Sequence, residues 1–195
     1  MVVTFKEKVR LALLKCAKLY KEKLVDSEYL IYSSEFHYQK YYQIASKEDN
    51  FLHLTGVLTK LTAQTFFDKC YDGSLLEEDF DLGNKSQKGS IRRKISVLEQ
   101  GILIFYDNGI LVEEKFEKNK ISCSFATSDN LCTMGFTKTR LAKPQTLLKG
   151  NQLSSSITPD LILKRSKDSN SFDTVIKNSL NLTDTEISAI LIDGD

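Results

Sequence analysis

The sequence has few residues of the kinds that build metal centres or disulfide frameworks. It holds only two histidines and four cysteines in 195 residues, and the cysteines are far apart, with no Cys-x-x-Cys pair. Zinc sites and small disulfide-bonded folds both need such residues in close clusters. We therefore expect no metal and no other cofactor, and we expect Cys16, Cys70, Cys123 and Cys132 to be buried thiols.

Long apolar runs are absent as well. Near the N-terminus, charged residues are so frequent that residues 11–14 form the longest uncharged run after Phe5. A secretory signal needs a longer apolar core, and a helix that crosses a bilayer needs ~20 apolar residues. The apolar runs at residues 102–106 and 189–192 are far shorter. We expect a cytoplasmic protein that does not enter a membrane.

Several enzyme signatures are missing. The chain has no GxxxxGK[ST], GxGxxG, GxSxG or HExxH motif, which argues against a P-loop NTPase, a dinucleotide enzyme, an α/β-hydrolase and a zincin. The net charge of +1 gives no global basic field. Charge is nevertheless uneven, because residues 77–81 are acidic and residues 85–94, KSQKGSIRRK, carry five basic side chains and no acid. This basic run is either a local binding face or an ordinary solvated surface.

Apolar periodicity predicts helices in the first half of the chain. Thr4 to Glu7 has the form of a capping box, and the apolar stripe that follows predicts a helix to about Leu24. Two β-rich stretches then predict a hairpin, at residues 29–33 and 40–45. Further helices are expected at residues 57–70, stopping near Gly73, and after an N-cap at Ser90, ending at Gly101.

The second half of the chain predicts mainly strands. Asp107-Asn-Gly109 between two apolar stretches indicates a hairpin of residues 102–106 with 110–116. Two more strands follow across residues 128–130, then a loop to residue 160 and a strand to Arg165. Residues 171–180 are expected to be a helix, and residues 183–193 either a capped helix or a strand. This order predicts an α+β fold, with a domain of residues 1–150 and a C-terminal α/β extension of residues 151–195 packed on it.

His53, in the stretch NFLHLTGV, is the residue best suited to general acid/base chemistry. The ordinary pKa of histidine, about 6.5, lies near neutral pH. A lone histidine among apolar residues is more often structural, although the nearby hydroxyl of Thr55 and the close backbone approach allowed by Gly56 favour a functional role. We expect His37, in the polar connection between two strands, to be a surface residue.

Basic and aromatic residues offer a second set of candidates. Arg92, Arg93 and Lys94 are suited to stabilising a phosphate that gains negative charge. Aromatic residues before them, Tyr42 among them, alternate with polar residues and are suited to stacking on unpaired bases. The competing interpretation is that these aromatics are alternate residues of a half-buried hairpin.

The order of these segments resembles a known protein group. A strand pair, NFLHLTGV, a helix ending in FFDKC, the basic RRKISVLEQ, then Gly135-Phe136 and PQTLL follow one another over residues 29–148. This order resembles phage and mobile-element relatives of the barnase, EndoU, colicin and RelE ribonuclease fold, and HLTG after Phe51 is its most specific part. The resemblance implies helices packed on an antiparallel sheet. It also implies metal-independent RNA cleavage, in which a 2′-hydroxyl attacks the adjacent phosphate to leave a 2′,3′-cyclic phosphate.

The resemblance also implies roles for particular residues. His53 matches the family's histidine and is expected to act as general base or acid, and Lys94 lies in its basic helix. Lys94 with Arg92 would stabilise the phosphorane, and Thr55 or Thr146 would orient the phosphate. Arg93 and Tyr42 are expected to bind the RNA, which would be tRNA or mRNA. No second proton-transfer group is evident from the sequence.

Two classes of non-enzyme compete with this interpretation. One is a phage-encoded inhibitor that binds a host defence protein, which the near-neutral charge and the missing proton-transfer partner favour. The other is an RNA-binding module without catalysis that uses the basic helix and the aromatic hairpin. The sequence indicates neither the RNA target nor the oligomeric state.

Overall fold

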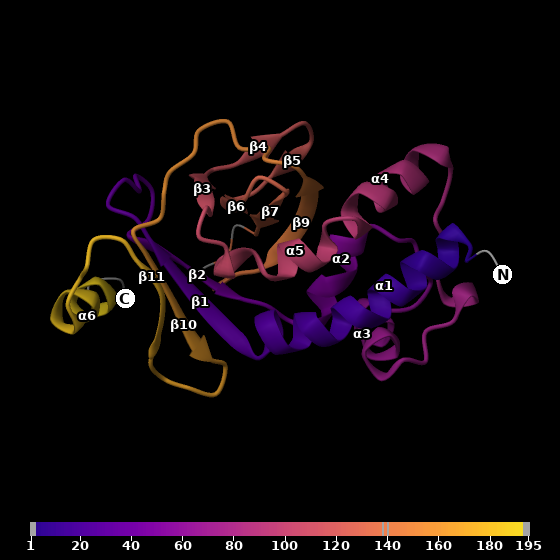
Figure 1. The fold of residues 1–195 in the computed structure, drawn as a ribbon, viewed down its shortest axis with the longest axis horizontal. Helices are drawn as coiled ribbons and strands as arrows, with labels where there is room; N and C mark the ends of the chain where they lie inside the picture. The colour runs from indigo at the N-terminus through magenta and orange to yellow at the C-terminus, as the bar shows by residue number, and fades with distance from the viewer. Residues whose placement is uncertain (1–2, 138, 140, 193–195) are drawn as a thin grey trace.

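The computed structural model describes residues 3–137, 139 and 141–192. It shows most of the helices gathered at one end of two β-sheets and the C-terminal helix at the opposite end (Figure 1). Helix α1, Phe5–Tyr20, begins at Thr4, whose hydroxyl accepts a hydrogen bond of 3.0 Å from the Glu7 amide. The helix continues through one π turn, η1, Lys21–Val25, and leads directly into the first strand. The long N-terminal helix predicted from the apolar stripe is confirmed.

The larger sheet has five strands in the order β11-β10-β1-β2-β8. Strands β1 and β10 pair antiparallel along their whole length, and β1 and β2 form the predicted hairpin. Strand β8 alone joins the sheet parallel to its neighbour. The bounds are β1, Ser27–Tyr32; β2, Tyr41–Ala45; β8, Leu141–Ala142; β10, Leu161–Ser166; and β11, Thr174–Asn178.

The second sheet has four antiparallel strands in the order β3-β6-β7-β9, and a two-stranded hairpin of β4 and β5 lies beside it (Figure 1). The predicted pairing across residues 128–130 is confirmed as β6 with β7. The bounds are β3, Leu111–Glu114; β4, Glu117–Lys118; β5, Ile121–Ser122; β6, Phe125–Ser128; β7, Cys132–Phe136; and β9, Pro144–Lys149. The expected α+β fold, with helices and antiparallel strands, is therefore what the structure shows.

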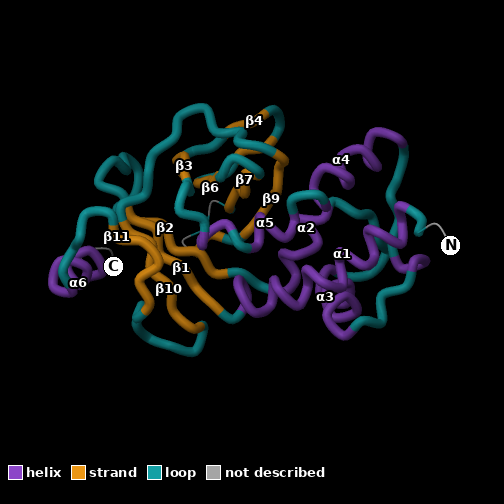
Figure 2. The backbone as a smooth tube through the Cα atoms, viewed as in Figure 1, coloured by secondary structure: helices purple, strands orange, loops and turns teal. Residues whose placement is uncertain are grey.

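One main hydrophobic core joins the helices to both sheets. It contains Leu13 of α1, Ile31 of β1 and Met134 of β7, all fully buried. The remaining helices are α2, Phe51–Thr55; α3, Ala63–Asp72; α4, Lys85–Ile95; α5, Leu98–Ile102; and α6, Asp184–Ile192. Three short 3-10 turns complete the list, η2, Glu48–Asn50; η3, Glu77–Asp79; and η4, Ile104–Tyr106. Figure 2 shows α1, α3 and α4 toward one end of the long axis, with α6 at the other end beyond the strands of the larger sheet.

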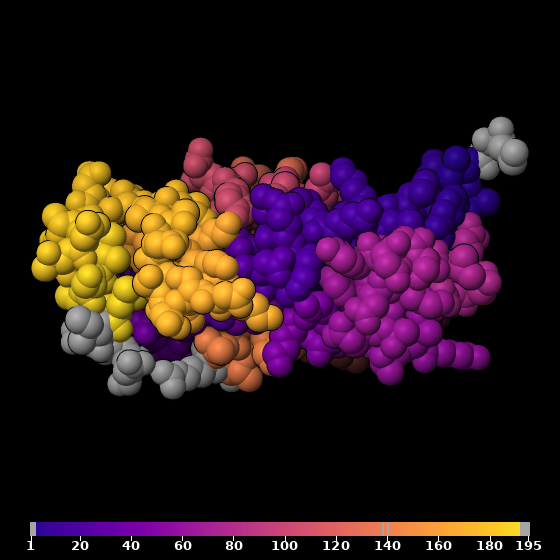
Figure 3. Space-filling model, turned by 90° about the horizontal axis from the view of Figure 1, so that it is seen from below, coloured from indigo at the N-terminus to yellow at the C-terminus, as the bar shows by residue number. Residues whose placement is uncertain are grey.

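The C-terminal helix α6 packs on the face of the five-stranded sheet that is turned away from the main core. Leu30 and Leu163 on that face pack against Ile187 and Ile190 of α6. In Figure 3 this segment lies at the end of the molecule away from the N-terminal helices. Residues 183–193 thus adopt the helical alternative over their described part. We keep the division into residues 1–150 and 151–195 as a proposal.

Four predicted elements differ from the structure. Two helices begin at other residues than predicted, and two segments have another type of secondary structure. The helix expected from residue 57 starts only at Ala63, because Thr62 caps it while Leu58 pairs with Asp81. Helix α4 begins at Lys85 with Asn84 as its N-cap, so Ser90 lies inside the helix.

The other two errors concern strands. Residues 102–106 end α5 and form η4 where a strand was predicted, and β3 pairs with β6. Residues 174–178 form β11 where a helix was predicted, because pairing with β10 supplies their backbone partners. A short apolar run fits both the helical period and the strand period, so only the packing decides between a helix and a strand.

All four cysteines are buried, as expected, and none takes part in a disulfide. The described residues hold no group of three or more side chains arranged for a metal ion. Within the same ranges, no helix has both the length and the apolar character that crossing a bilayer requires.

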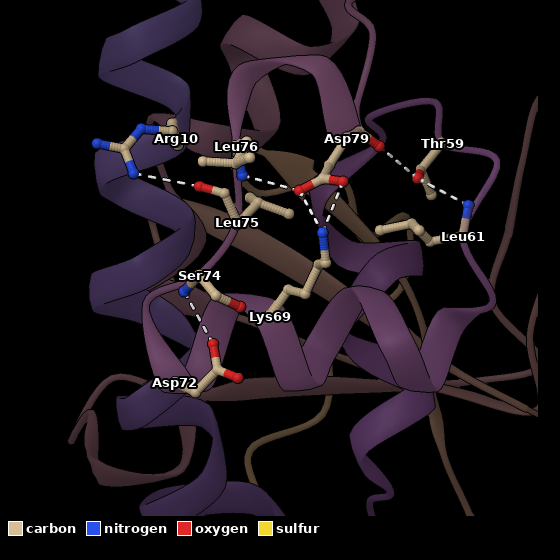
Figure 4. A network of polar contacts seen from close by, with 9 residues as sticks. All are labelled: Arg10, Thr59, Leu61, Lys69, Asp72, Ser74, Leu75, Leu76 and Asp79. Carbon is tan, nitrogen blue, oxygen red and sulfur yellow. Dashed lines mark hydrogen bonds and ion pairs between the residues drawn. The ribbon is translucent and has the colours of Figure 1, made fainter.

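A polar network attaches the segment after α3 to the helices (Figure 4). The Asp79 carboxylate accepts two hydrogen bonds of 2.8 Å from the Lys69 ammonium and one of 2.8 Å from the Leu76 amide, while the Asp79 carbonyl accepts one of 2.6 Å from the Thr59 hydroxyl. On the other side, Arg10 of α1 donates to the Leu75 carbonyl at 3.2 Å. The network thereby fixes the acidic turn η3 and Thr59 in the connection between α2 and α3.

We expect Asp79→Ala to destabilise the protein by about 1–3 kcal/mol, because the Lys69 ammonium and the Leu76 amide lose their shared acceptor. Urea unfolding measures this loss. Glu78→Ala is the matched control, since Glu78 lies in the same turn but is exposed. Equal stability of the two variants would contradict the structural role of Asp79.

Candidate nuclease site

Residues 51–55 of the stretch NFLHLTGV form the short helix α2, and two of its apolar side chains are buried in the core. Phe51 is fully buried, with its ring centroid 5.2 Å from that of Tyr20 and 5.7 Å from that of Phe67. Leu54 is also fully buried, whereas the side chain of His53 between them is exposed. The sequence therefore presents one imidazole to solvent on a helix whose position is fixed by its neighbours.

Gly56 ends α2 in the left-handed region, with φ of +72°. This turn lets the side chain of Lys94, from α4, pass directly over the backbone: a Cβ added to Gly56 would lie 3.0 Å from Lys94 Cδ. The Lys94 ammonium then donates a hydrogen bond of 2.8 Å to the carbonyl of His53. Two residues far apart in the sequence are thus brought to one place.

Partial burial changes the acidity of Lys94. Desolvation disfavours the charged form of its amine and lowers its pKa from 10.5 to about 8. A lysine with such a pKa exchanges its proton far more readily near neutral pH than an ordinary surface lysine. The His53 and Lys94 pair therefore combines an exposed imidazole with an acidic ammonium.

Gly56→Ala is expected to disturb this arrangement in two ways. A residue with a Cβ at positive φ costs about 1–2 kcal/mol, and the new methyl group would also push Lys94 away. The matched control is Gly73→Ala, because Gly73 ends α3 at φ +88° with nothing within 4 Å of a Cβ. Both variants should lose stability in urea unfolding, but only Gly56→Ala should also change the titration of Lys94 followed by NMR. An unaltered Lys94 titration in Gly56→Ala would contradict the contact.

The predicted arginines lie on the same helix as Lys94. Arg92 and Arg93 are exposed, as are Lys88 and Lys85, one and two turns before Arg92. The Arg92 guanidinium lies 4.8 Å from the ring centroid of Phe5, so α1 holds it in place. Helix α4 thus carries cations on the side that meets Phe5 of α1, while Lys94 of the same helix meets α2.

Thr55 is fully buried, and its hydroxyl serves the backbone. It donates to the Leu52 carbonyl at 2.8 Å and accepts from the Val57 amide at 3.3 Å. In this structure Thr55 supports the turn at Gly56 and does not present its hydroxyl to solvent.

Tyr42 lies on strand β2 and Thr146 on strand β9, and β9 packs against both α2 and α4. The Tyr42 ring stacks on Phe125 at 4.3 Å, and its hydroxyl donates to Glu114 at 2.8 Å. Burial raises the pKa of the Tyr42 hydroxyl. Tyr42 therefore belongs largely to the core, as the half-buried hairpin interpretation predicts.

The Thr146 side chain points to the face of the four-stranded sheet that bears Cys123. A Cβ on Gly135 would lie 3.1 Å from the Thr146 methyl and 2.6 Å from the Cys123 sulfur. The next residue, Leu147, faces Gly101 of α5 on the opposite side of the sheet. The structure thus groups His53 and Lys94, with Arg92 and Arg93 on the same helix. It places Thr146 on a strand that packs against α2 and α4, with its side chain turned toward Cys123.

Sequence reasoning did not single out Glu114, Lys115 or Glu117. Glu114 ends β3, Lys115 follows it and Glu117 begins β4. All three lie next to Tyr38 and Tyr42. Lys115 has φ of +51°, which is uncommon for a residue other than glycine, and nothing in the local sequence signals it. Only the structure brings these charged side chains beside the aromatic loop.

Comparison with known proteins identifies the family. Neither a curated protein nor a solved structure matches the chain. A family described as phage-Barnase-EndoU-ColicinE5/D-RelE like nuclease 4 matches residues 12–188, which run from within α1 to within α6. The α+β architecture is consistent with that match. This chain therefore belongs to the phage-type barnase, EndoU, colicin and RelE-like nuclease family.

Proposed function

We propose that this protein is an endoribonuclease that cuts RNA without a metal ion. The family membership supports nuclease activity. The observation that carries the proposal is the hydrogen bond of 2.8 Å from the Lys94 ammonium to the backbone carbonyl of His53. It joins a lysine of pKa about 8 to the short helix that carries the exposed imidazole. RNA carries its own nucleophile in the 2′-hydroxyl, so the protein needs to supply proton transfer and charge stabilisation.

In the proposed reaction, His53 acts as general base and Lys94 as general acid. The neutral imidazole takes the proton of the 2′-hydroxyl as that oxygen bonds to phosphorus. The bond from phosphorus to the 5′-oxygen then breaks, and the leaving oxygen takes a proton from the Lys94 ammonium. The products are a 2′,3′-cyclic phosphate and a free 5′-hydroxyl. Lys94 thus supplies the proton-transfer partner that the sequence alone did not identify.

The cations of α4 serve binding and charge stabilisation in this proposal. Arg92 and Arg93 are suited to bidentate contacts with phosphate oxygens, and the exposed Lys85 and Lys88 lie on the side of the helix that carries Arg92. Such contacts hold the RNA backbone in place without reading its bases. Affinity for RNA should therefore fall as the salt concentration rises.

The test is incubation of the purified protein with end-labelled tRNA and mRNA in excess EDTA. The proposal predicts cleavage that leaves 2′,3′-cyclic phosphate and 5′-hydroxyl ends. Activity that EDTA abolishes, products with 5′-phosphate ends, or no cleavage of either RNA would each overturn it.

A further inference from the structure

A hollow of about 330 Å³ lies between the loop of residues 33–40 and the β4–β5 hairpin. Its lining includes Tyr38 and Tyr42 on one side and Lys115, Glu117 and Ser122 on the other. The hollow is thus bounded by an aromatic wall and by a wall with one cation, one carboxylate and hydroxyl groups. It does not contain His53 or Lys94.

The aromatic wall is held in place by the carboxylate of Glu114. One oxygen accepts a hydrogen bond of 2.7 Å from the His37 amide, and the other accepts from the Tyr38 amide at 3.2 Å and from the Tyr42 hydroxyl at 2.8 Å. Phe36 adds an edge-on contact to the Tyr42 ring at 5.3 Å. The loop is therefore positioned by strand β3, and Tyr38 remains 57% exposed at its tip.

The opposite wall depends on an unusual backbone conformation. Lys115 has φ of +51°, which costs a residue with a Cβ roughly 1–2 kcal/mol. The Lys115 amide donates a hydrogen bond of 2.7 Å to the Ser124 carbonyl, which holds this conformation. The result is that the Lys115 ammonium lies 3.4 Å from the centroid of the Tyr38 ring. Strained residues of this kind gather at functional sites.

The chemistry of these walls limits what fits between them. Lys115 and Glu117 carry opposite charges, so the hollow has little net attraction for a simple anion. A flat ligand that stacks on a tyrosine, pairs N–H donors with a carboxylate and offers a phosphate to a lysine satisfies every group. An unpaired nucleotide has all three features, and a volume of about 330 Å³ is at the small end of ligand sites.

We propose that this hollow is a subsite for one unpaired nucleotide of an RNA strand. The base stacks on Tyr38 and displaces the Lys115 ammonium, which turns to the adjoining phosphate, while Glu117 accepts hydrogen bonds from the edge of the base. This inference rests on the proposed function for its choice of RNA as ligand. It assigns the hollow to binding and leaves the proton transfers with His53 and Lys94.

The test measures binding apart from cleavage. The probe is a fluorescent single-stranded oligonucleotide with 2′-O-methyl groups throughout, which lacks the nucleophile, and affinity is read by anisotropy over a range of salt concentrations. Tyr38→Ala should weaken binding about tenfold, through loss of stacking, whereas Tyr38→Phe should bind like the wild type. Lys115→Asn, which tolerates positive φ, should lower the steepness of the salt dependence by about 0.7, as expected for one lost phosphate contact.

Matched controls are Tyr71→Ala and Lys60→Asn, which remove an exposed tyrosine and an exposed lysine that do not line the hollow. Neither should change affinity beyond twofold. Failure of the wild type to bind the oligonucleotide, or equal binding by the wild type, Tyr38→Ala and Lys115→Asn, overturns the subsite. Cleavage of unmodified RNA in EDTA, measured in parallel, tests the proposed function separately. Weakened binding by the two variants supports the subsite even where no cleavage occurs.

Discussion

Replacing His53 with alanine is expected to slow RNA cleavage about 10²- to 10⁴-fold, the usual contribution of a general acid or base. The affinity for RNA should change little, because the cations of α4 remain. The side chain of His53 is exposed, so its removal should not unfold the protein. Single-turnover cleavage of end-labelled RNA in EDTA measures the rate, and thermal unfolding verifies that the variant is folded.

His37→Ala is the matched control for this prediction. His37 is the other histidine of the chain, its side chain is also exposed, and its contact with Glu114 runs through the backbone amide, which alanine keeps. We expect this variant to cleave at the wild-type rate. Cleavage by His53→Ala at the wild-type rate would remove His53 from the proposed mechanism.

Lys94→Met is expected to have opposite effects on activity and stability. Methionine keeps an apolar stem over Gly56 but cannot donate a proton, so cleavage should fall by about 100-fold or more. The lowering of the Lys94 pKa from 10.5 to about 8 corresponds to a penalty on the order of 3 kcal/mol for the charged form in the folded state. After allowance for the lost hydrogen bond to His53, the variant should be more stable than the wild type by about 2 kcal/mol at pH 7.

The pH dependence of this difference has a defined sign. Below pH 8 the lysine is protonated in both the folded and the unfolded chain, so the penalty is fully present. Between pH 8 and 10.5 the unfolded chain binds more protons, so wild-type stability rises with pH relative to Lys94→Met. Above pH 10.5 both states are neutral and the penalty is gone. Comparing the two proteins cancels the titration of buried tyrosines and cysteines.

Urea unfolding of both proteins from pH 6 to 10.5 measures this dependence. Lys18→Met is the control, because Lys18 is exposed on α1, outside the proposed RNA contacts, and should show neither effect. A Lys94→Met variant that is less stable than the wild type at pH 7 would contradict the lowered pKa. A variant that is more stable but cleaves normally would leave the pKa in place and remove Lys94 from proton transfer.

Much of the fold follows from short-range patterns in the sequence. The capping box at Thr4, the apolar stripe that follows it and the alternating strands around residues 29–45 each predict the element that is present. These patterns succeed because one face of each element is buried against the core and the other is solvated. The patterns fail at residues 102–106 and 174–178, where a short apolar or β-branched run fits more than one structure.

The sequence identified candidate site residues but not their arrangement. Residue type and the family resemblance indicated His53, Arg92, Arg93 and Lys94, because an imidazole and a cluster of cations suit phosphate chemistry wherever they lie. Their mutual positions are beyond what residue type can give. The 2.8 Å contact of Lys94 with the His53 carbonyl joins residues 41 apart in the sequence.

The sequence by itself determined the α+β class, the first helix, the first hairpin and the family of this protein, because these depend on local periodicity and on short motifs. Only the tertiary structure decided that Lys94 is desolvated, that Thr55 supports a turn, and that the Lys115 ammonium lies over the Tyr38 ring. The physical reason is that burial, pKa and side-chain proximity depend on how distant segments pack, which no single segment of the chain encodes.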